Sequence, residues 1–174
     1  MDPERIAVGF GLTEGMRAAD FGSGAGYFTT IIAKKVGDSG LVTAVDVLNS
    51  ALDMLRAKAK MDGLGNIQTV RSNLEVLGSS GLSNDSQDLV LLANILFQNS
   101  NKQPIISEAC RVLRPRGSLI VIDWRKGTGG FGPPDELRTD EEETKQLILG
   151  NDSLQLAGSI DAGIFHYGLV FRKI

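Results

Sequence analysis

Short runs rich in Val, Ile and Leu alternate with helix-like stretches along most of the chain, and this alternation constrains the fold more than any other feature. It is typical of βα units, which build a parallel sheet covered by helices. We expect strands at residues 17–21, 41–46, 67–71, 88–93 and 118–123, and helices at about 27–36, 50–62 and 103–113. The near-continuous apolar run at 88–93 indicates a central strand that is buried on both faces. The sequence therefore predicts an α/β fold.

The chain changes character after residue 125. Lys126–Pro134 is rich in glycine and proline and is expected to form a mobile loop. Thr139 followed by Glu142 predicts a capping box and a helix to about Leu149. The acidic run at 140–143 suits a metal or cation site, but it also suits the positive end of a helix dipole, and we favour the helix and predict no metal.

The last two apolar segments, at about 153–157 and 165–172, are joined by residues 158–163. This connection is too short for a helix, so the two segments are expected to pair as an antiparallel hairpin. No internal repeat and no second domain is apparent, and the 174 residues suit one domain.

Composition narrows the function classes. A net charge of −3 lacks the basic character of a nucleic-acid binder, so a small-molecule substrate is favoured and a nucleic-acid substrate is unlikely. No apolar run reaches the ~20 residues of a membrane span. The single cysteine cannot form an internal disulfide, and no secretory signal opens the chain, which makes a cytoplasmic location the default expectation.

A glycine-rich turn, Asp20-Phe-Gly-Ser-Gly-Ala-Gly26, lies between the first strand and the first helix of the predicted sheet. Glycines there let a ligand approach the backbone. The third glycine falls one residue earlier than in the Gly-x-Gly-x-x-Gly turn of dinucleotide sites, where Tyr27 stands instead. Asp20 would repel a pyrophosphate but could accept hydrogen bonds from an ammonium group.

Asp46, at the end of the second strand, is placed to accept both hydroxyls of a ribose. Its position alone equally suits a turn residue before Asn49 and Ser50, and the glycine turn upstream favours the ligand. Val47 and Leu48 would then provide an apolar wall for a purine.

These motifs resemble those of class I S-adenosylmethionine-dependent methyltransferases, nearest to the small-molecule type that includes ubiquinone and menaquinone C-methyltransferases. Three further segments carry the resemblance: Ser72-Asn-Leu-Glu75, Asp88-Leu-Val-Leu-Leu92, and the run from Arg111 to Asp123. It implies a Rossmann-like three-layer sandwich with a seven-stranded, mostly parallel sheet in the order 3-2-1-4-5-7-6.

The resemblance also implies S-adenosylmethionine as the cofactor. Asp20 would hold its ammonium, Asp46 its ribose, and Asn73 with Leu74 the adenine edge, although many relatives have Asp where Asn73 stands. Ala93 and Asn94 would border the sulfonium and the acceptor. The expected cofactor-binding residues are Asp20, Gly22, Ser23, Gly24, Gly26, Asp46, Val47, Asn73, Leu74, Ala93 and Asn94.

The acceptor is expected at the carboxyl ends of the strands, where open α/β sheets bind ligands. The cofactor already supplies an electrophilic methyl group, so the protein mainly aligns the acceptor, and a general base is optional. His166 and Asn94 are weak catalytic candidates, and packing is the commoner role of a lone histidine. Positional candidates for contacting the substrate are Phe97, Gln98, Asp123, Trp124, Arg125 and Tyr167.

Other functions stay open. They are a protein or RNA methyltransferase and a non-catalytic nucleotide-binding module; an NAD-dependent reductase lacks the glycine spacing and a Tyr-x-x-x-Lys pair. Residues 126–134 and 1–13 are candidate lids, and a homodimer would also close the pocket.

Overall fold

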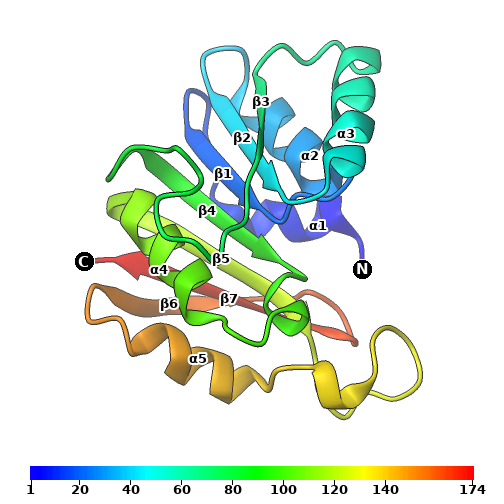
Figure 1. Cartoon of the computed structure of the whole chain (residues 1–174), viewed down its shortest axis with the longest axis vertical. Coiled ribbons are helices and arrows are strands. Elements are labelled where there is room, and N and C mark those ends of the chain that lie inside the picture. Colours follow the sequence, from blue (N-terminus) through cyan, green and yellow to red (C-terminus); the bar gives the residue numbers. More distant parts are fainter.

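A seven-stranded sheet organises the molecule, as the computed structural model of all 174 residues shows (Figure 1). Its order is β3-β2-β1-β4-β5-β7-β6, which confirms the predicted sheet. The five parallel strands are followed by β7, which runs antiparallel to both β5 and β6. The strands are β1 (Arg17–Phe21), β2 (Leu41–Asp46), β3 (Ile67–Arg71), β4 (Gln87–Ala93), β5 (Leu113–Trp124), β6 (Leu154–Ile160) and β7 (His166–Lys173).

Helices cover both faces of the sheet and enclose two apolar cores. α1 (Pro3–Ala7) and α2 (Tyr27–Val36) pack with one face, and α4 (Gln103–Val112) and α5 (Glu141–Leu149) with the other. α3 (Asn49–Met61) packs along β2 and β3. Short 3-10 turns are η1 (Val8–Phe10), η2 (Leu96–Gln98) and η3 (Asp135–Leu137). None of these helices combines the length and the apolar character that crossing a membrane requires.

Three expected boundaries are wrong. The strand expected at about 153–157 is β6, which extends to Ile160, so residues 158–160 pair with β7 instead of lying in the connection between the two strands. The fifth strand begins at Leu113 rather than Ser118, and the turn at Arg116 and Gly117 lies inside it as an irregularity in the pairing with β4. The N-cap of α5 is Asp140, not Thr139: a carboxylate oxygen of Asp140 accepts the backbone N–H of Glu142 at 2.9 Å. Asp at an N-cap satisfies the same free amide that the threonine was expected to satisfy.

The loop 126–134, which was expected to be a mobile, glycine-rich segment, is built around a buried cation. The Arg138 side chain is 2% exposed, and all five of its N–H groups donate to the loop or its edge. Their acceptors are the carbonyl oxygens of Arg125, Gly129, Phe131 and Pro133 and the hydroxyl of Thr128, at 2.6–3.3 Å. Ordered contacts of this kind hold a loop that has few apolar side chains of its own.

The N-terminal segment 1–13, which is a candidate lid, contains the short helix α1 and the 3-10 turn η1. Asp2 caps α1 by accepting the backbone N–H of Glu4 at 3.1 Å, and Pro3 stands at the first helical position. Ile6 and Phe10 are buried in the same core as α2. The segment therefore forms part of the packed structure.

Candidate cofactor site

The glycine turn connects β1 to α2 and is tied to the end of β2. The backbone N–H groups of Gly22 and Ser23 both donate to the carbonyl of Val45, at 2.8 and 3.1 Å. Gly26 is the N-cap residue of α2 with φ of +82°, and a Cβ there would lie 2.2 Å from the Leu55 side chain. Gly26 therefore allows α2 and α3 to approach closely.

Asp46 joins the turn to the carboxyl end of β2. One of its carboxylate oxygens accepts the N–H of Gly24 at 2.8 Å, and the other accepts the N–H of Leu48 at 2.9 Å. These two bonds fix the direction of the carboxylate without using all of its acceptor capacity. An acid that is held this way can still accept hydroxyl groups of a ligand.

Asp20 lies at the end of β1 beneath the turn and is 2% exposed. Its carboxylate accepts the Thr29 hydroxyl at 2.6 Å. Burial raises the pKa of Asp20 to about 6; the Thr29 hydrogen bond opposes this rise and the nearby Asp46 adds to it. No cation of the protein pairs with Asp20 in a salt bridge. A ligand cation beside it would stabilise its charged form.

A first cavity of about 300 Å³ opens beside the turn. Its walls come from the ends of β1, β2, β3 and β4 and from the starts of α3 and α4. Asp46 and Asn73 provide polar groups, and Val47, Leu48 and Ile105 provide apolar ones. Its other lining residues are Gly22, Gly24, Ala51, Ser72, Leu74, Glu75, Asn94, Ile95, Gln98 and Asn99.

A second cavity has a volume of about 340 Å³ and shares two lining residues with the first, Gly22 and Asn94. Its remaining lining residues are Met1, Pro3, Asp20, Ser23, Tyr27, Phe28 and Ala93. The Ser23 hydroxyl and the Asn94 amide oxygen are buried without a hydrogen-bond partner. Buried polar atoms of this kind are uncommon, and a ligand group could satisfy both. The backbone of Asn94 also has a φ of +54°, which is uncommon for a residue other than glycine.

Most of the residues expected to bind the cofactor line one of these two cavities. They are Asp20, Gly22, Ser23, Gly24, Asp46, Val47, Asn73, Leu74, Ala93 and Asn94. Gly26 lines neither cavity. Among the expected substrate residues, only Gln98 lines one of them.

The other candidates lie elsewhere at the strand ends. Arg125 pairs with Glu141 at 2.8 Å, and the Phe97 N–H donates to the Asp123 carboxylate at 3.1 Å. The His166 ring lies against the Trp124 ring, with centroids 4.1 Å apart. Neither Trp124 nor His166 lines either of the two cavities.

His166 is therefore placed as a packed residue. It is 4% exposed, and burial lowers its pKa to about 4, so the imidazole is neutral at pH 7. Its neighbour Tyr167 is buried as well, and the two hydroxyls of Tyr167 and Thr144 lie 2.7 Å apart. A packing role was the commoner expectation for a lone histidine, and the burial of His166 against Trp124 agrees with it.

Sequence reasoning missed several lining residues. Ile105 and Asn99 belong to α4 and the segment before it, far along the chain from the glycine motif, and no local pattern signals their approach. Ala51 lies at the start of α3, shortly after Asp46. Its place near the carboxyl end of β2 could have indicated that it lines the cavity. Met1 and Pro3 belong to segment 1–13, which was expected only as a candidate lid, and they line the second cavity where α1 packs beside α2.

Comparison with known proteins gives a consistent result. The model of a methyltransferase domain family matches residues 12–165. Ubiquinone/menaquinone biosynthesis C-methyltransferase UbiE of Shewanella pealeana is 32% identical over 117 residues, which cover 67% of this chain and 45% of that protein. The matched part of the chain thus spans less than half the length of this curated relative.

Solved structures agree on the fold. A SAM dependent methyltransferase from Aquifex aeolicus has a TM-score of 0.88 and 29% identity, over 99% of this chain and 90% of that one. The [4+2]-cyclase SpnF has a TM-score of 0.81 over 98% of this chain and 79% of that chain, at 17% identity, which shows a shared fold alone.

Proposed function

Because the chain belongs to the methyltransferase domain family, we propose that it transfers a methyl group from S-adenosylmethionine to a small-molecule acceptor. The observation that carries the proposal is the pair of cavities that meet at Gly22 and Asn94. One suits a nucleoside and the other holds a buried acid with no cationic partner. The sulfonium that joins the two parts of the cofactor would lie near Gly22 and Asn94, which line both cavities.

The residues of the two cavities fit the cofactor. A Cβ built on Gly24 meets no atom within 4 Å, so the turn leaves free space where a ligand can lie against the backbone. Asp46 would hold the ribose hydroxyls, with Val47 and Leu48 beside the adenine. Asp20 and the unpartnered Ser23 hydroxyl would receive the ammonium and carboxylate of the methionine part.

The bound cofactor supplies an electrophilic methyl group, so this chain's own residues have to bind, orient and exclude water. Asn94 stands where the two cavities meet, and its unpartnered amide oxygen would accept an N–H or O–H of the acceptor. Tyr27, Phe28 and Pro3 would shield that place from water. His166 would not serve as the base, because its pKa of about 4 and its packing against Trp124 do not suit that role.

A small-molecule acceptor is supported by the relatives and by charge. UbiE is named as a C-methyltransferase of ubiquinone and menaquinone biosynthesis. The net charge of −3 and the absence of a lysine or arginine from both cavities disfavour a phosphate-rich substrate.

The test is calorimetric titration of the purified protein with S-adenosylmethionine and, separately, with NADH. We expect micromolar binding of S-adenosylmethionine only, lost in Asp46→Ala. Asp38→Ala is the matched control, because it removes the same charge from an exposed turn between α2 and β2. Absence of S-adenosylmethionine binding to the folded protein would refute the proposal.

The acceptor class is tested with S-adenosylmethionine that carries a labelled methyl group, incubated with fractions of small metabolites, protein and RNA. Label in the metabolite fraction is expected. Label in protein or RNA would move the acceptor to that class. Binding of the cofactor with no transfer to any fraction would favour a non-catalytic binding module.

A further inference from the structure

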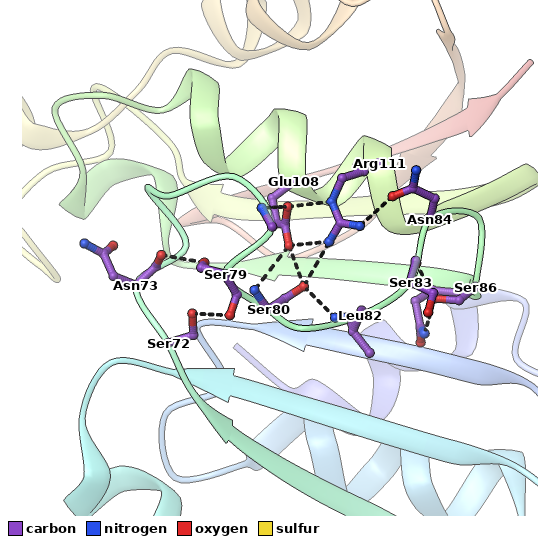
Figure 2. A network of polar contacts seen from close by, with 12 residues as sticks. Ser72, Asn73, Ser79, Ser80, Leu82, Ser83, Asn84, Ser86, Glu108 and Arg111 are labelled. Atoms are coloured by element: carbon purple, nitrogen blue, oxygen red, sulfur yellow. Dashed lines mark hydrogen bonds and ion pairs between the residues drawn. The ribbon is translucent and has the colours of Figure 1, made fainter.

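A buried carboxylate outside the cavities holds the loop that forms one of their walls (Figure 2). Glu108 lies on α4 and is 0% exposed. Its two oxygens accept the backbone N–H groups of Gly78 at 2.7 Å and Ser80 at 3.2 Å, and also the Ser80 hydroxyl. The Arg111 guanidinium donates to it at 2.7 and 2.9 Å. The carboxylate thus accepts from three groups of one loop.

That loop, residues 72–86, begins with the cavity residues Ser72 to Glu75. Two reciprocal bonds connect this beginning to the part that Glu108 holds. The Ser72 hydroxyl donates to the Ser79 carbonyl, and the Ser79 hydroxyl donates to the Asn73 carbonyl, both at 2.7 Å. Figure 2 shows the resulting chain of contacts from Asn73 to Glu108. The position of the cavity wall therefore depends on the carboxylate behind it.

Arg111 extends the same support to the far end of the loop. Its guanidinium donates to the side-chain oxygen of Asn84 at 2.7 Å. On the same helix, Ile105 lies one turn before Glu108 and lines the first cavity directly. α4 therefore lines the first cavity directly with Ile105. Through Glu108 it also holds the loop whose residues 72–75 form another wall of that cavity.

The ionised state of Glu108 is secured by these contacts. Burial alone would raise its pKa, but the hydrogen bonds from Arg111, Ser80 and Gly78 outweigh burial and lower the pKa to about 2. A glutamine in its place would present an N–H₂ group to donors, and at least one of them would lose its acceptor. The loop would then be held less well.

We propose that Glu108 is a positioning residue that keeps the Asn73–Glu75 wall shaped for the adenosine part of the cofactor. The inference rests on the proposed function, because it requires that the first cavity binds the nucleoside. A wall that is aligned before binding spares the ligand the cost of ordering it. Loss of Glu108 should therefore weaken binding and leave the methyl-transfer step itself unchanged.

The experiment compares S-adenosylmethionine and adenosine affinities, by calorimetry, in the wild type and in Glu108→Gln. We expect both affinities to fall by about tenfold and by the same factor, because both ligands use the wall. Hydrogen exchange should rise in residues 72–82 only.

Asp88→Asn is the matched control for the loss of a carboxylate that pairs with an arginine and accepts a backbone N–H. The Asp88 side chain is 11% exposed, pairs with Arg114 at 2.6 Å and accepts the Arg17 N–H at 2.7 Å at the opposite end of the sheet. It should lower stability and leave both affinities unchanged. Should Glu108→Gln fail to fold, Ser80→Ala removes only one hydroxyl from the network and should weaken both ligands about threefold.

Three results would overturn the inference: unchanged affinities in folded Glu108→Gln and Ser80→Ala, an equal loss in Asp88→Asn, or a loss for S-adenosylmethionine that adenosine does not share. A wild type that binds no S-adenosylmethionine would refute the proposed function as well. A wild type that binds it equally well with and without Glu108 would refute the positioning role alone.

Discussion

Replacing Asp20 by Asn is expected to stabilise the free protein while it weakens cofactor binding. The carboxylate is buried and has no cationic partner, and its pKa of about 6 lies above the ordinary value of 3.8. For an acid whose pKa is raised on folding, stability is lost as the pH rises from about 4 to about 6, and the loss is complete above that range. This pKa difference corresponds to about 3 kcal/mol in the free energy of unfolding.

Asparagine has the same shape, can still accept the Thr29 hydroxyl, and carries no charge to desolvate. At pH 7.5 Asp20→Asn should therefore be more stable by up to about 3 kcal/mol, which raises the melting temperature by roughly 5–10 °C. At pH 4 the two proteins should be nearly equal, because the wild-type carboxyl is protonated there.

The assay is urea unfolding from pH 4 to pH 8, followed by calorimetry with S-adenosylmethionine. The variant should bind the cofactor at least about tenfold more weakly, because the ammonium loses a charged acceptor. Wild-type affinity should also decline as the pH falls below about 6, whereas the affinity of the variant should stay flat in that range. A variant that is less stable at pH 7.5, or a stability difference that does not change with pH, would refute the reasoning.

Four further substitutions test individual contacts of the site and of the fold. Gly24→Ala should abolish S-adenosylmethionine binding in calorimetry at a stability cost of only about 1–2 kcal/mol, since its Cβ enters the cavity and meets no protein atom. Gly26→Ala should cost about 2–4 kcal/mol in urea unfolding, because its Cβ meets Leu55 and φ is positive; a cost below 1 kcal/mol would contradict this. Arg138→Leu should speed proteolysis within residues 126–134, since five loop acceptors lose their donor; unchanged cleavage would show that the loop holds itself. Tyr167→Phe should lower unfolding free energy by about 1 kcal/mol through the loss of the bond to Thr144.

The sheet and the glycine turn could be predicted because their determinants are local. Strands β1, β2 and β3 have the predicted bounds, since each begins shortly after a clear turn signal that contains glycine. Asp46 could be assigned to the cavity because parallel strands end at one edge of the sheet. The relevant information lies within a few residues of each feature.

The features that were missed depend on contacts between distant segments. Glu108 reads as an ordinary polar residue of an amphipathic helix, and only tertiary packing brings Gly78 and Ser80 to its oxygens. Arg138 likewise shows no sequence signal for a loop wrapped around it. Trp124 and His166 were expected near the acceptor because they lie at strand ends, yet they pack against each other, because the antiparallel pairing of β5 with β7 places them directly opposite one another.

The place of β7 has a consequence for synthesis. β7 follows every other strand in the sequence but pairs between β5 and β6, so β6 has no partner until β7 has been made. Until then the β5 edge of a nascent chain has unpaired backbone groups beside apolar Leu119 and Val121. Such an edge recruits strands from other chains. Aggregation during translation should therefore begin at β5, and adding the completed β6–β7 hairpin is the step that ends this exposure.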